Sequence, residues 1–242
     1  CYIDLARHIG NDRPFYALQA RGIEPGDEPH STIESMAADY LEAIRTIRPR
    51  GPYILTGWSV GATVAFEMAL LLENAGEPLP ALMMIDAPSP FSDPYEEEDD
   101  IEFLLERLRP LAGLPFEELN RHESEEAQLT YIFEEIRLAG LVSPDTETAD
   151  SKRHLKLHKY HNKVVCDYRP SAPFSGKIIF FKPSEKIPFD VKMQNPVQGW
   201  KAFAAGEMEV YDMPGNHFNM LSDSHSSVLA QKMKECIEFL IH

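Results

Sequence analysis

The feature that most constrains the fold is an alternation of short apolar segments with longer segments of helical periodicity. Tyr53–Thr56 and Ala81–Ile85 have the length and apolar composition of buried strands. Thr32–Ile47 and Val60–Ala75 repeat apolar residues at helical spacing, and Ser31–Glu34 resembles a capping box before the first of these helices. Strands that alternate with covering helices build a parallel sheet. The sequence therefore predicts an α/β fold.

Other segments extend the same pattern toward both ends of the chain. Pro14–Gly22 has the composition of a strand that ends in glycine, and the sheet is expected to resume at Gly176–Phe181 and Met208–Tyr211. Ser226–Ile241 is expected to form a closing amphipathic helix, with Val228 among the residues on its inner side. The predicted sheet is mostly parallel and flanked by helices.

The alternation stops between residues 88 and 173, where no buried strand is expected. Three charged helical stretches replace it: Ile101–Arg109, Glu125–Leu141 and Thr148–Val165. An all-helical insertion of this size within an α/β pattern suggests a lid, with bounds near 92–166. The organisation expected is one domain over residues 1–242 that contains this insertion.

Composition excludes several classes of function. The formal net charge of −16 argues against nucleic acid as a partner, because phosphate binding needs clustered lysine and arginine. The acidic run 96–100 favours a solvated segment over a docking surface for a basic partner. No apolar run reaches the roughly 18 to 20 residues that a membrane span needs. We therefore expect a soluble protein that acts on neither nucleic acid nor membrane.

The cysteines indicate the compartment. Cys1, Cys166 and Cys236 are odd in number and far apart, so they predict neither a disulfide framework nor a metal site. A reducing, cytoplasmic compartment fits this usage. The sequence begins with cysteine and shows no signal-peptide pattern, which suggests a piece of a longer protein.

The strongest local motif is Gly57-Trp58-Ser59-Val60-Gly61, a G-x-S-x-G pattern between a predicted strand and a predicted helix. Strand, sharp turn and helix together are the setting of a nucleophile elbow, in which the serine hydroxyl projects above the sheet. The glycines leave room for neighbouring backbone to approach. The N–H of Val60, at the helix start, would point toward an oxyanion formed at Ser59. An ordinary glycine-rich turn is the alternative interpretation.

A serine nucleophile needs a general base, and His217 is the best candidate among the nine histidines. It lies in a loop after the strand predicted at Met208–Tyr211, where this architecture exposes functional groups. His154, His158 and His161 recur at helical spacing, but no cysteine or carboxylate ligand accompanies them, so a solvated helix face is favoured over a metal site.

Three carboxylates are candidates for the acid that orients the histidine. Asp86 ends the buried strand Ala81–Ile85 and would emerge at the same sheet edge as Ser59. Glu185 follows the strand Gly176–Phe181, where many hydrolases place the acid, but it lies in a lysine-flanked polar loop. Asp212 adjoins the histidine loop. We favour Asp86, then Glu185, then Asp212.

With these motifs in place, the whole chain resembles the thioesterase domains that end nonribosomal peptide synthetases, and related polyketide synthase domains, of the α/β-hydrolase superfamily. Five features occur in the same order along the chain as in that family: PFYALQARG, IRPRGPYILTGWSVGATVAFEMA, the strand ending in Asp86, the helical insertion and PGNHF. The tryptophan in GWSVG is typical of integrated (type I) domains, whereas free-standing editing (type II) enzymes usually carry GHS. The resemblance also places the acid at Asp86.

The resemblance implies a function. An acyl or peptidyl chain would arrive as a thioester on the phosphopantetheine arm of an upstream carrier domain, transfer to Ser59, and leave by hydrolysis or macrocyclisation. The arm belongs to the carrier, so no cofactor is expected in this domain. The family's first strand and its second oxyanion donor would lie before Cys1, which leaves Val60 as the assignable donor. Ala62 replaces a glycine common after the motif.

Three alternatives stay open from the sequence. A lipase or carboxylesterase that acts on oxygen esters uses the same three residues, so the motif does not distinguish it from a thioesterase. A stand-alone editing thioesterase is a second alternative. A non-catalytic binding module on a hydrolase fold is the third, and the presence of all three candidate residues argues against it.

Overall fold

The computed structural model describes residues 1–242 except residues 78, 98, 113–117, 139–146, 187–194 and 242. Its strands are β1 (Leu55–Trp58), β2 (Ala81–Ile85), β3 (Lys177–Pro183) and β4 (Met208–Met213). Its helices are α1 (Ile3–Ile9), α2 (Ile33–Ile47), α3 (Val60–Asn74), α4 (Asp100–Ala112), α5 (Glu125–Leu138), α6 (Thr148–Asp167), α7 (Pro196–Lys201) and α8 (Asp223–Ile241), with a short 3-10 turn at Leu119–Arg121.

The described strands form one parallel sheet in the order β1-β2-β3-β4. All five residues of β2 are buried, because β2 pairs on both sides and both faces are covered. Trp58 pairs with Ile85, and Ile85 pairs with Phe181, so the carboxyl ends of β1, β2 and β3 lie side by side. The α/β prediction is confirmed, with strand bounds that differ by at most two residues.

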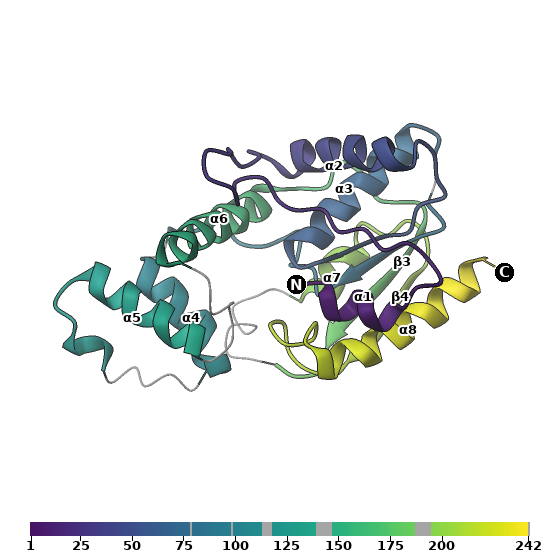
Figure 1. The fold of residues 1–242 in the computed structure, drawn as a ribbon. Helices are drawn as coiled ribbons and strands as arrows, with labels where there is room; N and C mark the ends of the chain where they lie inside the picture. Colours follow the sequence, from purple (N-terminus) through teal and green to yellow (C-terminus); the bar gives the residue numbers. More distant parts are fainter. Residues whose placement is uncertain (78, 98, 113–117, 139–146, 187–194, 242) are drawn as a thin grey trace.

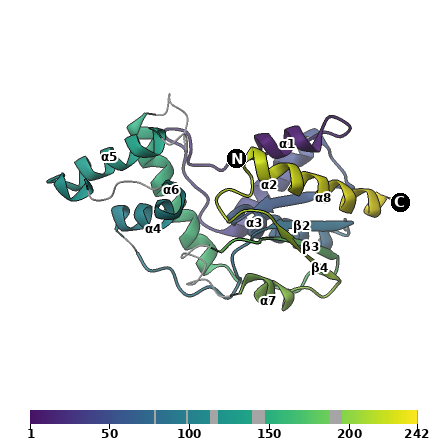
Figure 2. The ribbon, with the colours of Figure 1, turned by 90° about the horizontal axis from the view of Figure 1, so that it is seen from below.

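Two apolar clusters cover the two faces of this sheet. On one face α2, α3 and α7 pack around Phe66, Phe180 and Trp200. On the other, α1 and α8 pack around Leu5, Phe181 and others. Figure 1 shows α2 and α3 on one side of the strands with α1 and α8 on the other, and Figure 2 shows α7 next to β4. The sheet is therefore the middle of three layers.

The α2 and α3 helices begin and end where local chemistry dictates. Thr32 caps α2: its hydroxyl accepts the N–H of Ser35, and the Ser35 hydroxyl accepts the N–H of Thr32. The capping box is thus one residue later than the predicted Ser31–Glu34 pair. The α3 helix stops before Gly76, which adopts a φ of +72° that favours glycine.

The strand predicted at Pro14–Gly22 is wrong. Residues 14–20 have no regular secondary structure, and Tyr16 and Leu18 are 63% and 39% exposed. Apolar composition alone does not make a strand, because a strand also needs a neighbour with which to exchange backbone hydrogen bonds. The segment instead crosses the surface between α1 and α2 (Figure 1).

Two details near the chain's end also differ from prediction. In α8, Leu229, Met233 and Ile237 are buried as expected, but Val228 is 48% exposed and does not face the core. The α7 helix was not predicted. It has six residues and begins with a proline, so its sequence is too short to show helical periodicity.

The described residues of the insertion between β2 and β3 form helices joined by irregular segments and contain no strand, as predicted. Its helices α4, α5 and α6 surround a small apolar cluster of their own, which includes Phe103, Ile132 and Phe133. The remaining stretches of the predicted 92–166 segment, at 98, 113–117 and 139–146, lie outside the described residues, including the end of the predicted Glu125–Leu141 helix. Figure 1 shows α4 and α5 to one side of the sheet layers.

The α6 helix connects the insertion to the sheet layers. With 20 residues it is about 30 Å long, enough to reach both. Leu155, near its start, belongs to the insertion's cluster, whereas Val164 and Val165, near its end, pack with α2 and α3. No helix among the described residues combines the length and the apolarity that crossing a membrane requires.

Candidate active site

Ser59 sits on a sharp bend between β1 and α3. Its φ of +54° is unusual for a non-glycine residue, and its N–H donates to the carbonyl of Ile85 at 3.0 Å. A Cβ added to Gly57 would come within 2.1 Å of the Gly61 carbonyl oxygen, so that position of the bend admits only glycine. This is the predicted strand–turn–helix geometry with the serine at its apex.

Asp86 ends the neighbouring strand in a matching conformation. Its φ is +42°, and its N–H donates to the carbonyl of Phe181 at 2.8 Å. Among the described residues, Ser59 and Asp86 are the two non-glycine residues with positive φ. Strained backbone of this kind is held only where surrounding structure fixes it, and it gathers at functional sites. The register of β1 on β2 places both residues at the same sheet edge.

His217 lies in the loop between β4 and α8. Its Nδ1 is 2.7 Å from Oδ2 of Asp86, and the two side chains are 15% and 13% exposed. The imidazole ring also lies against the indole of Trp58, with ring centroids 5.0 Å apart. Within the described part of the chain, His217 makes no hydrogen bond to Ser59. With Nδ1 bonded to the carboxylate, Nε2 is the nitrogen left for Ser59, and such contacts often tighten only when substrate binds.

The rival carboxylates lie in other surroundings. Glu185 has an exposed side chain, and its backbone N–H donates to the carbonyl of Gly215 in the histidine loop at 3.0 Å. Asp212 is 63% exposed and pairs with Lys182. The structure therefore brings Asp86, and neither of these rivals, to His217.

The loop that carries His217 is braced by two asparagines that sequence reasoning missed. The side-chain oxygen of Asn219 accepts the N–H of Asn216 at 2.7 Å, and the side-chain oxygen of Asn216 accepts the N–H of Phe218 at 3.0 Å. Gly215 has a φ of +88°, and a Cβ there would come within 2.3 Å of Asn219. Asparagine next to glycine is a turn signal that could have indicated this brace.

Tyr2 is another residue of the site that the sequence did not identify. Its hydroxyl accepts the backbone N–H of Trp58 at 2.9 Å, one residue before Ser59. Burial raises the pKa of the Tyr2 phenol, so the hydroxyl stays protonated at neutral pH. No local signal predicts a contact between residues 56 positions apart. Tyr2 fixes the strand end that precedes the bend.

Val60 is the first residue of α3, as predicted. The first N–H groups of a helix have no partner within it, and they carry the positive end of the helix dipole. Among the described residues, the N–H of Val60 has no hydrogen-bond partner within α3, and it belongs to the residue that follows Ser59.

The elbow helix is tied to the end of α6 by a buried polar pair. Tyr168 donates its hydroxyl to Oε2 of Glu67 at 2.6 Å, and both residues are less than a tenth exposed. Burial raises the pKa of Glu67, outweighing the hydrogen bond from Tyr168, and burial also raises the pKa of Tyr168. This pair joins α3 to the chain segment that returns from the insertion.

Three histidines lie along α6, where the sequence left a metal site as the less favoured interpretation. His154, His158 and His161 lie along α6, and burial lowers the pKa of His161. Within the described residues, no group of three or more histidine, cysteine, aspartate or glutamate side chains is arranged to hold a metal ion.

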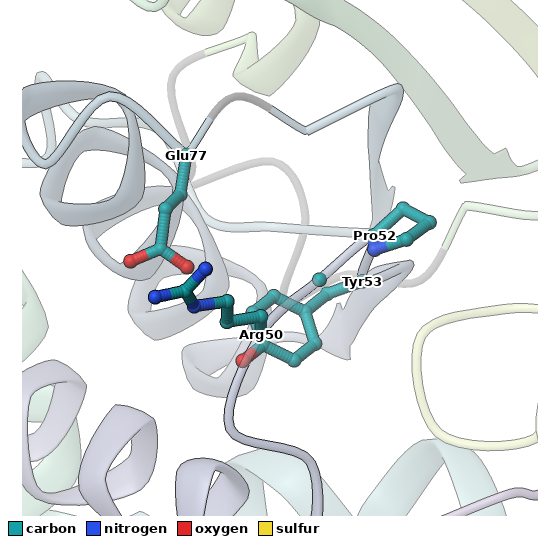
Figure 3. Close-up of a pocket in the computed structure, with 5 residues that line it drawn as sticks. Arg50, Pro52, Tyr53 and Glu77 are labelled. Carbon is teal, nitrogen blue, oxygen red and sulfur yellow. The ribbon is translucent and has the colours of Figure 1, made fainter.

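A surface hollow lies near the start of β1, at the end of the sheet opposite to Ser59. It is lined by Arg50, Gly51, Pro52, Tyr53 and Glu77 (Figure 3). These residues precede β1 or follow α3, whereas Ser59 lies where β1 ends and α3 begins. The hollow is therefore separate from the site around Ser59.

Comparison with known proteins identifies the family. A family model described as a thioesterase domain matches residues 1–236. The chain belongs to the thioesterase domain family. It is 34% identical over 244 residues to a dimodular nonribosomal peptide synthase of Bacillus subtilis (strain 168). This match covers 97% of this chain and 10% of that protein. It is 31% identical to malpibaldin synthetase of Mortierella alpina, covering 90% and 4%. The thioesterase domain thus spans a tenth or less of these relatives' lengths.

Solved structures agree on the fold. A four-domain nonribosomal peptide synthetase bound to AMP and glycine matches with a TM-score of 0.80 and 23% identity, covering 98% of this chain and 18% of that one. The NocB thioesterase domain, in covalent complex with a fluorophosphonate nocardicin G analogue, matches with a TM-score of 0.62 and 22% identity, covering 88% and 78%. The thioesterase domain described here therefore has the α/β-hydrolase fold that the sequence predicted.

Proposed function

We propose that this thioesterase domain takes an acyl or peptidyl chain from a carrier-bound thioester onto Ser59 and then releases it. The observation that carries the proposal is the 2.7 Å contact between His217 and Asp86 beside the strained bend at Ser59. A carboxylate that orients an imidazole next to a serine on a sharp turn is the arrangement that activates a hydroxyl for acyl transfer.

The first half-reaction forms an ester on the enzyme. Nε2 of His217 accepts the Ser59 proton as Oγ attacks the thioester carbonyl carbon, and the carbonyl oxygen becomes an oxyanion. The N–H of Val60 donates a hydrogen bond to that oxyanion. The carbon–sulfur bond then breaks, and His217 returns the proton to the leaving thiol. Asp86 holds the tautomer of His217 and stabilises its cation, but takes no proton itself.

The second half-reaction releases the chain. His217 activates water, which gives a free acid, or an amine or hydroxyl of the acyl chain itself, which gives a macrocycle. We propose that the helical insertion, residues 92–166, covers the bound chain and governs which nucleophile reaches the ester. The position of α4, α5 and α6 beside the sheet layers is compatible with this role (Figure 1).

The substrate would arrive on a carrier domain. One relative is a dimodular nonribosomal peptide synthase and one matching structure is a four-domain nonribosomal peptide synthetase. This domain covers 10% and 18% of them, which supports a carrier on the same polypeptide. The phosphopantetheine arm is then part of the substrate, and the domain needs no cofactor of its own. We propose that the protein acts in the cytoplasm.

The test compares matched thioesters and oxygen esters. Acyl-pantetheine thioesters of several chain lengths should be turned over faster than the corresponding oxygen esters, and Ser59→Ala should abolish both activities while leaving the circular dichroism spectrum unchanged. Preference for oxygen esters would indicate a carboxylesterase instead. Undiminished turnover by Ser59→Ala would remove Ser59 from the nucleophile role. Product analysis by mass spectrometry separates free acid from macrocycle.

A further inference from the structure

Trp58 has a contact that the reaction described above does not use. Its indole ring lies against the imidazole of His217, with centroids 5.0 Å apart and planes inclined by 31°. We propose that Trp58 is a positioning residue: a platform that holds the His217 ring within reach of both Asp86 and Ser59 and favours its protonated form during acyl transfer. This inference rests on the function proposed above.

The hydrogen bond to Asp86 does not by itself fix the imidazole. It holds one atom, Nδ1, and leaves the ring able to swing about that point. Phe218 also contacts the ring, at 5.1 Å and nearly perpendicular, but it is the next residue in the same loop and moves with His217. Trp58 comes from a different element, β1, so its contact restrains the loop relative to the sheet.

The position of Trp58 relates the base directly to the nucleophile. Trp58 and Ser59 are consecutive residues. Contact with the Trp58 side chain therefore also positions the His217 ring relative to Ser59. The backbone of Trp58 is held by pairing with Ile85 and by the hydrogen bond from its N–H to Tyr2. Its side chain packs against the apolar cluster between the sheet, α1 and α8. The half-buried indole is therefore anchored to the sheet and not to the loop that carries His217.

The chemistry of indole suits the platform role. The face of an aromatic ring attracts a cation, and tryptophan does so most strongly. His217 becomes a cation when it accepts the Ser59 proton, so this attraction grows as the transition state forms and contributes to rate. Filling space does not explain the choice of residue, because the indole Nε1 is buried with no partner among the described residues, a cost that phenylalanine would avoid.

The test uses Trp58→Leu, which removes the aromatic face, and Trp58→Phe, which keeps one. Trp58→Leu should lower kcat for an acyl-pantetheine thioester by about 10- to 100-fold with little change in KM, the loss expected for a poorly oriented base. Trp58→Phe should recover most of the loss. Phe174→Leu removes a fully buried aromatic ring that lies before the start of β3, away from the site, and should leave kcat unchanged. Retention of wild-type kcat by Trp58→Leu, or an equal loss in Trp58→Phe, would overturn the proposal.

A spectroscopic measurement separates this proposal from the proposed function. The proton shared by His217 and Asp86 should give a low-field NMR signal in the wild type and in Ser59→Ala, whether or not the protein turns over a thioester. Adding Trp58→Leu to Ser59→Ala should broaden or abolish that signal, because the ring is no longer held. An unchanged signal would overturn the platform role, while an inactive wild type with a signal sensitive to Trp58 would overturn only the proposed function.

Discussion

The sheet layers and the helical insertion bury their apolar residues in different ways. In the sheet layers, β2 is buried along its whole length and α3 is buried on nearly every side. In the insertion, α5 buries one side only, and Leu138 at its end is 77% exposed. Few buried contacts mean low local stability. We therefore expect the sheet layers, which carry every candidate catalytic residue, to be locally more stable than the helical insertion.

The largest expected effect is a loss of acyl transfer from a change at the carboxyl ends of the strands, where the candidate catalytic residues lie. Asp86→Asn should lower acyl transfer on the order of 10⁴-fold, because the amide favours the wrong tautomer of His217. Two control variants are Glu185→Gln, in an exposed loop, and Phe133→Ala, in the insertion. A small fluorophosphonate should label both at a rate near that of the wild type. A greater loss from Glu185→Gln than from Asp86→Asn would reassign the acid.

The second effect compares the two apolar clusters. Phe180→Ala, in the middle of β3, should lower the free energy of unfolding by about 3–5 kcal/mol. Ile132→Ala, in the insertion's cluster, should instead accelerate amide hydrogen exchange in α4 and α5 while leaving the strands protected. Hydrogen exchange measured by mass spectrometry tests both. Uniform acceleration across all strands in Ile132→Ala would show that the two regions unfold as one unit.

The smallest effect concerns the pair that joins the two regions. Because the folded-state pKa of Glu67 is raised by burial, its ionisation costs stability: the loss begins above the unfolded value near 4.5 and is complete above the folded value. Glu67→Gln keeps an acceptor for Tyr168 but does not ionise. Urea unfolding across this pH window should show the variant gaining stability relative to the wild type as pH rises. A constant difference would mean that Glu67 does not titrate there.

The sequence predicted the sheet layers better than the contacts between distant residues. The strands at Ala81–Ile85 and around Ser59 were identifiable because buried strands, glycines and helix starts leave local signals. The brace from Tyr2 to Trp58 leaves none, because it depends on residues far apart in the chain. The prediction of a strand at Pro14–Gly22 failed for a related reason, since local composition does not reveal whether a segment has a neighbouring strand with which to pair.

Intact-mass spectrometry of the domain after incubation with an acyl-pantetheine thioester tests the central claim most directly. We predict a mass increase equal to the acyl group, located by peptide mapping to Ser59, with the adduct accumulating when the medium lacks a competent nucleophile for release and absent from Ser59→Ala. Thioester turnover without any adduct, or with the acyl group on another residue, would contradict the account.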